Sequence, residues 1–273
     1  MKAKFTLIGI TVLFVIGILA AQSYAKVDPK TCVGMWMFDE GKGDTTADSS
    51  GNKNDGTLKG PKWINGKFGK ALDFGGANDY VVIPNGATVL EQQFTQMSIM
   101  AWVYPTANGG GSYGPTVIAR TDGDGWSMRI NNGQLLADLR LSVTSVTAPI
   151  PPTQVTLNAW NHIAITYNSS TGIITGYING NNIGTLKGNG TLKNAGNAKT
   201  CTFIGTDPAG CTPQGAEFDF SGNIDEMAVF NTALTENDIK SIMNDGLVVA
   251  LGSVTAVHPS GKLTATWADI KTR

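Results

Sequence analysis

The stretch Met97-Ser-Ile-Met-Ala-Trp-Val-Tyr104, followed directly by Pro105, decides the fold. Its β-branched and aromatic residues are typical of strands, and proline cannot donate a hydrogen bond to a β-ladder. The stretch therefore predicts a strand that ends at Tyr104. Short runs of the same kind recur on both sides of it, and they are separated by the turn residues Gly, Asn and Asp.

Strands dominate the rest of the chain. They are expected at residues 33–38, 71–74, 80–83, 116–120, 126–130, 134–141, 160–167, 173–178, 182–185, 201–204 and 221–230. Asn131-Asn132-Gly133 and Asn179-Gly180 predict tight hairpin turns, because Asn and Gly tolerate a positive φ.

One helix is predicted near the C-terminal end. Thr235 is suited to cap its first turn, Asp238 occupies the capping-box position three residues later, and Gly246 ends it. Its apolar face would consist of Ile239, Ile242 and Met243. Because strands do not alternate with helices, the sequence predicts an all-β fold, an antiparallel two-sheet β-sandwich with one short C-terminal helix.

The first 25 residues have the layout of a secretory signal peptide. Lys2 and Lys4 precede an apolar run from Phe5 to Ala21, and Ser23-Tyr-Ala25 places small residues before a cleavage site after Ala25. The alternative is an uncleaved membrane anchor, although a span needs about 17–25 residues and this run is at the short limit. We expect a secreted protein, extracellular or periplasmic, that would touch a membrane only if the segment stays uncleaved.

The mature chain is expected to hold one large β domain at residues 26–246, followed by a C-terminal extension at residues 247–273. Charged residues make up 15% of the sequence, which contains 34 Gly and 11 Pro. Low charge with many turn-formers is typical of a sheet protein with many loops. The formal net charge of −1 shows no basic excess, which argues against nucleic acid as a partner.

The three cysteines lie in an exported, oxidising context. Cys201 and Cys211 bracket a short strand followed by turn residues, so we predict a disulfide between them. The alternative is a pair of reduced, buried thiols. Cys32 is then the odd cysteine, buried beside the first strand or available to a partner chain.

Several stretches, in order along the chain, resemble the laminin-G-like jelly-roll domains of secreted bacterial proteins, within the concanavalin A-like lectin/glucanase superfamily. They are Trp36-Met-Phe-Asp-Glu-Gly41, Asp48-Ser-Ser-Gly-Asn-Lys-Asn-Asp-Gly56, Gly69-Lys-Ala-Leu-Asp-Phe74, Asp79-Tyr-Val81, Ser98-Ile-Met-Ala-Trp-Val103, Trp160-Asn-His-Ile-Ala-Ile-Thr-Tyr167, Tyr177-Ile-Asn-Gly180, Gly222-Asn-Ile-Asp-Glu-Met-Ala-Val-Phe230 and Ala233-Leu-Thr-Glu236. The resemblance implies the jelly-roll connectivity of the two sheets. One departure is Phe74-Gly75-Gly76, where the family usually has Phe-Asp-Gly.

The resemblance also implies a structural calcium ion. In the superfamily a calcium commonly ties an N-terminal loop to the strand that carries Ile-Asp-Glu, whose aspartate is Asp225 here. The loop from Asp48 to Gly56 is rich in the oxygen donors that calcium prefers. We expect Asp48, Asn54 and Asp225 as ligands of Ca2+, with Asp39 as a weaker candidate. The alternative is an ordinary Asx-rich turn that bonds to its own backbone.

A catalytic site is not predicted. Glu217 and Asp219 fall on one face of a strand in the manner of laminarinase-like glycosidases, but Ser221 and Gly222 stand where the second Glu should be. A retaining glycosidase needs two carboxyl groups about 5–5.5 Å apart. His162 is interpreted as a structural histidine. We therefore expect a protein that is not an enzyme.

Aromatic residues beside glycine-rich loops are the candidate ligand contacts. Trp126 follows Asp122-Gly-Asp-Gly125, and Tyr113 lies in Asn108-Gly-Gly-Gly-Ser-Tyr-Gly114. Such loops on a rigid sandwich often carry recognition, although Trp126 could equally belong to the core. We expect a recognition module for a glycan or an extracellular protein. The alternatives are a glycoside hydrolase or lyase, and a purely architectural surface domain.

Overall fold

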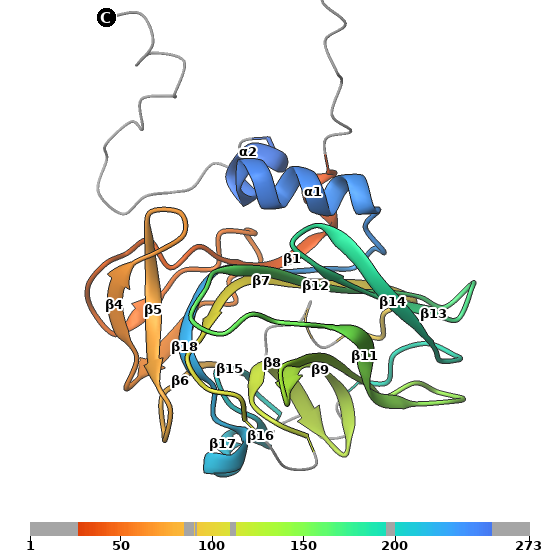
Figure 1. Cartoon of the computed structure of the whole chain (residues 1–273), viewed down its shortest axis with the longest axis horizontal. Coiled ribbons are helices and arrows are strands. Elements are labelled where there is room, and N and C mark those ends of the chain that lie inside the picture. Colours follow the sequence, from red (N-terminus) through yellow and green to blue (C-terminus); the bar gives the residue numbers. More distant parts are fainter. Residues whose placement is uncertain (1–26, 85–89, 91, 110–112, 195–199, 253–273) are drawn as a thin grey trace, which may run out of the picture.

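The computed structural model describes residues 27–84, 90, 92–109, 113–194 and 200–252. Two large antiparallel sheets pack face to face, and two helices lie over the outer surface of one of them (Figure 1). The predicted all-β sandwich is confirmed. The expected signal peptide at residues 1–25 and most of the expected C-terminal extension lie outside the described residues.

Each large sheet has eight strands. The first sheet contains β14 (Asn181–Lys187), β13 (Ile173–Ile178), β12 (Asn161–Asn168), β7 (Gln96–Pro105), β18 (Ser221–Phe230), β5 (Lys70–Gly75) and β4 (Lys62–Asn65) in this order, with β1 (Cys32–Trp36) paired to β18. The second contains β11 (Val146–Gln154), β10 (Gln134–Leu139), β9 (Asp124–Asn131), β8 (Thr116–Asp122), β15 (Thr202–Ile204), β6 (Tyr80–Ile83), β3 (Gly56–Lys59) and β2 (Thr45–Thr46). A separate hairpin joins β16 (Pro208–Ala209) to β17 (Thr212–Pro213).

The strand β7 lies between β12 and β18, and both of its faces are covered. Ile99, Ala101 and Val103 point into the main core between the sheets, whereas Met100 points into a second apolar cluster on the outside of the first sheet. Period-two alternation puts successive side chains on opposite faces. A strand covered on both faces has a nearly continuous apolar sequence, which is why this stretch stands out in the sequence.

The second apolar cluster lies beneath α1 (Glu236–Asp245) and α2 (Leu247–Ala250), two helices that follow β18. Thr235 and Asp238 form the predicted capping box, and Ile239 and Ile242 are buried against the sheet. Leu247 is also fully buried, so the domain boundary expected at Gly246 falls between two packed helices. Among the described residues, no helix is long and apolar enough to cross a membrane.

The two predicted tight turns are confirmed by their backbone angles. Asn132 and Gly133 have φ of 49° and 77° between β9 and β10, and Asn179 and Gly180 have φ of 50° and 75° between β13 and β14. Two further 3-10 turns, η1 (Pro29–Thr31) and η2 (Ala216–Phe218), complete the described elements.

Candidate functional site

Polar side chains cover the outer face of the second sheet. Trp126, Met128 and Ala137 point into the main core. The residues that alternate with them along the strands, among them Ser127 and Asp138, therefore point away from the core. These outward side chains are nevertheless buried, because the chain segment after β15 folds over them. The second sheet thus carries a covered polar layer rather than a bare surface.

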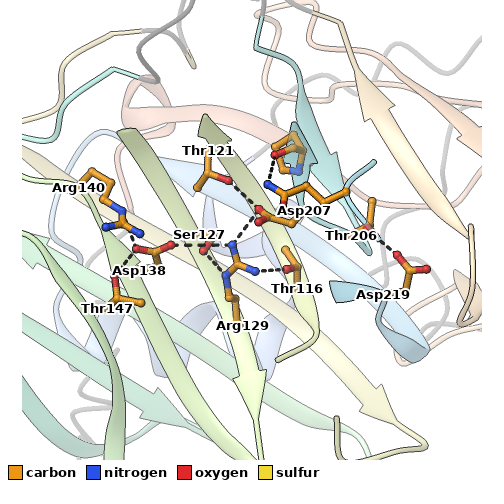
Figure 2. A network of polar contacts seen from close by, with 12 residues as sticks. Thr116, Thr121, Ser127, Arg129, Asp138, Arg140, Thr147, Thr206, Asp207 and Asp219 are labelled. Atoms are coloured by element: carbon orange, nitrogen blue, oxygen red, sulfur yellow. Dashed lines mark hydrogen bonds and ion pairs between the residues drawn. The ribbon is translucent and has the colours of Figure 1, made fainter. Parts of the chain in front are cut away.

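Arg129 is the centre of this layer (Figure 2). Its Nε donates to Ser127 Oγ at 2.7 Å, and its Nη1 donates to Thr116 Oγ1 at 2.8 Å. Its Nη2 lies 2.8 Å from Asp207 Oδ1 and 3.9 Å from Asp138 Oδ2. Only 2% of the arginine side chain is exposed, so the guanidinium is a buried cation whose hydrogen-bonding capacity is used by the protein.

Asp138 extends the network toward the edge of the sheet. Its Oδ1 accepts from Thr147 on β11 at 2.7 Å and lies 3.1 Å from Arg140 Nε. Arg140 is about one third exposed, so its end is the part of the network that solvent reaches. Two arginines and two aspartates balance one another here, and the layer has no net charge.

The segment that covers the polar layer is closed by a disulfide. Cys201 and Cys211 are bonded as predicted, and their Cα atoms lie 4.8 Å apart. Within this loop Asp207 bonds both Arg129 and the Thr121 hydroxyl, the latter at 2.7 Å. The disulfide therefore restricts the loop that carries Asp207, the main counterion of Arg129.

Two aromatic rings stand against the guanidinium of Arg129. The ring centroids of Tyr113 and Phe218 lie 5.7 Å and 5.6 Å from its Cζ atom and 6.4 Å from each other. Rings at such distances attract a cation through their π faces. A cavity of about 170 Å³ opens beside these rings; it is lined by Tyr113, Thr121, Gly123, Arg129, Asp138, Arg140, Asp207, Gln214 and Phe218.

A second cavity, of about 270 Å³, is lined by sequence neighbours of Tyr113 and Phe218. It is lined by Ala107, Gly109, Pro115, Ala216, Glu217, Asp219 and Ser221. Asp219 is largely satisfied inside the protein, because its carboxylate accepts from the Thr206 hydroxyl at 2.6 Å and from the Asn78 N–H at 2.9 Å. Glu217, in contrast, is exposed.

The two expected ligand-binding aromatics are found in different places. Trp126 is 2% exposed and packs in the main core, so the interpretation of it as a ligand contact is corrected. Its position on β9 directs the indole between the sheets, although the residue follows a glycine-rich turn. Tyr113 is 38% exposed and lies at the edge of the smaller cavity.

The loop expected to bind calcium forms a closed turn. Both Asp48 carboxylate oxygens accept backbone hydrogen bonds, from Met35 and Ser50 on one side and from Asn54 on the other, each at 2.9 Å. The Asn54 side chain donates to Asp48 Oδ2 at 2.8 Å and to the Val33 carbonyl at 2.8 Å. Asp48 and Asn54 thus lie together and bond to each other and to the backbone, while the buried Asn54 Oδ1 has no hydrogen-bond partner among the described residues.

Asp225 makes its hydrogen bonds with a different segment. Its Oδ2 accepts from the N–H groups of Lys67 and Phe68 at 2.8 Å and 2.9 Å, whereas its fully buried Oδ1 has no hydrogen-bond partner among the described residues. Asp39 Oδ1 accepts from the N–H of Lys70, in the same turn, at 2.8 Å. The turn at residues 66–70 therefore binds the carboxylates of both Asp39 and Asp225.

Two carboxyl groups near this turn have raised pKa values. Burial is the main cause and neighbouring carboxylates, among them Asp39, add a smaller part, so that the pKa of Asp225 rises to about 7 and that of Glu226 to about 8. The turn itself leaves little room for side chains, since a Cβ on Gly66 would lie 2.5 Å from Asp225 Oδ2 and a Cβ on Gly69 would lie 2.1 Å from Asp39 Oδ1. Among the described residues, no three His, Cys, Asp or Glu side chains gather as metal ligands.

The remaining candidates lie inside the protein. His162 is 1% exposed, its ring packs on Trp102 with centroids 5.3 Å apart, and burial lowers its pKa to about 3. Its backbone N–H donates to Asn179 Oδ1 at 2.9 Å. Cys32, the first residue of β1, is 2% exposed, and burial raises the pKa of its thiol to about 12.

Sequence reasoning missed the centre of the site, namely Arg129, Asp138, Asp207 and Phe218. One signal was available. Arg129 alternates with Met128 and Ile130 along its strand, so strand periodicity places it on the outer face, where a charged residue must be exposed or paired.

Comparisons with known proteins agree with this fold. A family model, Laminin_G_3, described as the concanavalin A-like lectin/glucanases superfamily, matches residues 74–240. No curated protein sequence matches the chain significantly.

Solved structures with the same fold include two binding domains and one domain of an arabinanase. The binding domain of Paraclostridial Mosquitocidal Protein 1 is 18% identical with a TM-score of 0.62, and the match covers 80% of this chain and 52% of that one. Domain 4 of AbnA, a GH43 extracellular arabinanase from Geobacillus stearothermophilus, in complex with arabinotriose, is 19% identical with a TM-score of 0.58 and coverages of 78% and 98%. The binding domain of botulinum neurotoxin DC, in complex with rat synaptotagmin II, is 18% identical with a TM-score of 0.57 and coverages of 80% and 52%.

These likenesses concern the fold. The chain spans about half the length of the toxin binding domains and nearly all of the arabinanase domain. The family model, in contrast, matches more than half of this chain directly from its sequence. The protein therefore belongs to the concanavalin A-like lectin/glucanases superfamily, as a laminin-G-like jelly-roll domain.

Proposed function

We propose that the protein is a glycan-binding module that holds a neutral sugar at the Tyr113–Phe218 ring pair on the outer face of the second sheet. The observation that carries this proposal is the combination of two aromatic rings, one of them 38% exposed, with a charge-balanced polar layer beside a cavity. Ligand sites commonly pair apolar walls with a few fixed polar groups.

The polar groups suit hydroxyl-rich ligands. A sugar hydroxyl both donates and accepts hydrogen bonds, and the cavity offers the partly exposed Arg140 as a donor and the exposed carboxamide of Gln214. Since two cations and two carboxylates balance each other, a charged ligand would gain little from the site. The arrangement therefore favours a neutral sugar over an anionic one.

The relatives support this assignment by analogy. The arabinanase domain was solved with arabinotriose bound, and the toxin domains are described as binding domains. A protein partner is the second candidate, since one toxin domain was solved with synaptotagmin. The small, polar cavity favours the glycan, because protein interfaces are broad and usually bury about 800 Å² on each partner.

The test is binding of the purified protein to an array of neutral oligosaccharides that includes arabinotriose. Tyr113→Ala should weaken binding of the retained glycan at least tenfold, because stacking on the ring is lost, and Tyr113→Phe should bind as the wild type does. Retention of no neutral glycan, or equal binding by Tyr113→Ala, would show that the proposal is wrong.

We also propose a structural calcium ion at the turn of residues 66–70. The support is the fully buried Asp225 Oδ1, which has no hydrogen-bond partner among the described residues, and the second carboxylate of Asp39 on the same turn. Hard oxygen ligands, including backbone carbonyls, are those that calcium prefers. Asp225 and Asp39 would supply the carboxylates, and the ion would tie the end of β1 to β18.

The calcium proposal is tested by the thermal midpoint with and without chelator. Calcium should raise the midpoint of the wild type and should not raise that of Asp225→Asn, whereas Asp48→Asn should keep the response. An unchanged wild-type midpoint at pH 8, where the carboxylates are ionised, would overturn the proposal.

Export from the cytoplasm is proposed as well. The Cys201–Cys211 disulfide supports it, because such bonds persist in oxidising compartments. N-terminal sequencing of the mature protein should find Lys26 first. A mature chain that begins at Met1 would contradict cleavage.

A further inference from the structure

Three buried polar atoms lie in one row across the first sheet. Trp102 on β7 is the cross-strand partner of His162 on β12 and of Asp225 on β18. Trp102 Nε1, His162 Nδ1 and Asp225 Oδ1 are all buried, and none has a hydrogen-bond partner among the described residues. Buried polar side-chain atoms almost always have a partner, either in the protein or in ordered water. Three neighbouring exceptions therefore indicate a shared partner.

The three side chains share the outer face of the sheet. Met100, two residues before Trp102, belongs to the second apolar cluster beneath the helices, and strand alternation puts Trp102 on the same side. Cross-strand partners face the same side of a sheet, with Cβ atoms about 4.5–5.5 Å apart. The rings of Trp102 and His162 accordingly lie with their centroids 5.3 Å apart.

The row is closed to solvent. Trp102, His162 and Asp225 are 6%, 1% and 0% exposed. Two residues of the neighbouring turn pack against the indole, since Lys67 Nζ lies 4.5 Å from the centroid of the Trp102 ring and the Phe68 ring lies 6.2 Å from it. The N–H groups of these two residues bond Asp225 Oδ2, so Oδ1 is left for another donor. A partner enclosed here must be small.

The chemistry of the three atoms defines that partner. The indole nitrogen can only donate a hydrogen bond, whereas a carboxylate can only accept. His162 is neutral at pH 7 and above, because burial lowers its pKa to about 3, and the unprotonated nitrogen of a neutral imidazole accepts. A cation could not accept from Trp102, and an anion would be repelled by Asp225. A water molecule, with two hydrogens and two lone pairs, matches one donor and two acceptors.

We infer that one structural water molecule is bound in this row, where it accepts from Trp102 Nε1–H and donates to His162 Nδ1 and Asp225 Oδ1. Internal waters typically make about three hydrogen bonds to otherwise unsatisfied buried groups. The water links side chains of three neighbouring strands and holds His162 in the tautomer that is protonated at Nε2. The calcium ion proposed above does not exclude it, because a carboxylate offers about four lone-pair sites.

The experiment detects water beside the indole proton. NOE and ROE spectra with selective excitation of water are recorded at pH 8 on the 15N-labelled protein. A calcium chelator is present, so the outcome does not depend on the calcium proposal. Trp102 Hε1 should show a direct ROE to water. Trp36 is the internal control and should show none, because its buried indole donates to the Asn54 carbonyl at 2.8 Å. Absence of the ROE at Trp102 would overturn the inference.

The tautomer of His162 gives an independent readout. Long-range 1H–15N correlation spectra should show His162 Nδ1 unprotonated, and a proton on Nδ1 would contradict the assigned water. His162→Phe keeps an aromatic ring and removes the acceptor, so the ROE at Trp102 should be lost. Tyr167→Phe is the matched control, since Tyr167 is buried on the opposite face of the same strand, and it should keep the ROE. A full ROE in His162→Phe would also overturn the inference, and the two wild-type spectra decide the question if that variant does not fold.

Discussion

Asp207 reaches Arg129 across the outer face of the second sheet, with Oδ1 of the aspartate 2.8 Å from Nη2 of the arginine. The two side chains are 6% and 2% exposed. They come from distant segments, since Arg129 is on β9 and Asp207 lies in the loop closed by Cys201 and Cys211. This ion pair therefore joins the covering loop to the polar layer, together with the hydrogen bond from Thr121 to Asp207.

Asp207→Asn should destabilise the fold markedly. The substitution leaves Arg129 with Asp138 at 3.9 Å as its remaining carboxylate. Removing one partner of a buried ion pair commonly costs about 3–5 kcal/mol, and since Asp138 remains we expect a loss of about 3 kcal/mol. Urea denaturation measures the free energy of unfolding.

The matched control is Asp124→Asn. Asp124 pairs with Lys193 at 3.2 Å, but the two side chains are 35% and 41% exposed. Exposed pairs contribute about 0–1 kcal/mol, so this variant should be close to the wild type. Equal effects of the two substitutions would mean that burial does not govern the Arg129 pair.

Loss of the disulfide should also destabilise the protein. The Cys201→Ser/Cys211→Ser double variant opens a loop whose ends are 10 residues apart, and the chain-entropy argument gives about 3 kcal/mol for a loop of this size. Because Asp207 lies within the loop, glycan affinity should fall as well. Calorimetric midpoints and the glycan titration measure the two effects, and a variant with wild-type values in both would contradict the assigned role.

Protonation of His162 should limit stability at acid pH. Burial lowers its pKa from 6.5 to about 3, so the unfolded chain binds the proton more readily than the folded one. The stability that the folded state gains from a neutral His162 is therefore fully present above pH 6.5 and is lost as the pH falls toward 3. Between these values each pH unit costs about 1.4 kcal/mol.

The comparison is between wild type and His162→Gln in urea denaturation from pH 7.5 to pH 4. The wild type should lose about 3 kcal/mol more than the variant over this range, because only the wild type carries the buried imidazole. Using the difference between the two proteins removes the titration of the carboxyl groups that they share. Parallel curves would show that His162 protonates freely in the folded state.

The fold could be predicted from the sequence because its signals are local. The run at residues 97–104 is buried on both faces in β7, and the Asn132-Gly133 turn has the positive φ that these residues permit. The strand β11 was missed because Pro149, Pro151 and Pro152 argue against a strand. These prolines are tolerated because β11 lies at the edge of its sheet.

The candidate site could not be predicted in the same way, because its contacts join distant segments. Nothing local to Arg129 indicates that Asp207 will neutralise it, and nothing local to Phe218 indicates that its ring will meet Tyr113. Trp126 shows the opposite error, since a glycine-rich turn suggested exposure while strand alternation directed the ring into the core. Local patterns place residues on faces of a sheet, but long-range packing decides what covers each face.

Glu217 provides the last prediction, which concerns chemistry. A glycosidase needs two carboxyl groups that flank the scissile bond, and in retaining enzymes these groups lie about 5–5.5 Å apart. Asp219, the neighbouring carboxylate, is 9% exposed and is held by Thr206 and Asn78, so it is poorly placed to attack a sugar. We therefore expect the purified protein to release no reducing sugar from arabinan, xylan or β-glucan.

Glu217→Gln separates binding from catalysis. The substitution keeps the shape of the side chain and removes its charge, and Glu217 does not line the cavity beside the Tyr113–Phe218 pair, so glycan binding should stay close to that of the wild type and the background of sugar release should not change. The two readouts are a titration and a reducing-sugar assay on the same protein preparation. Release of sugar by the wild type that disappears in Glu217→Gln would establish a hydrolase and overturn the expectation of a pure binding module.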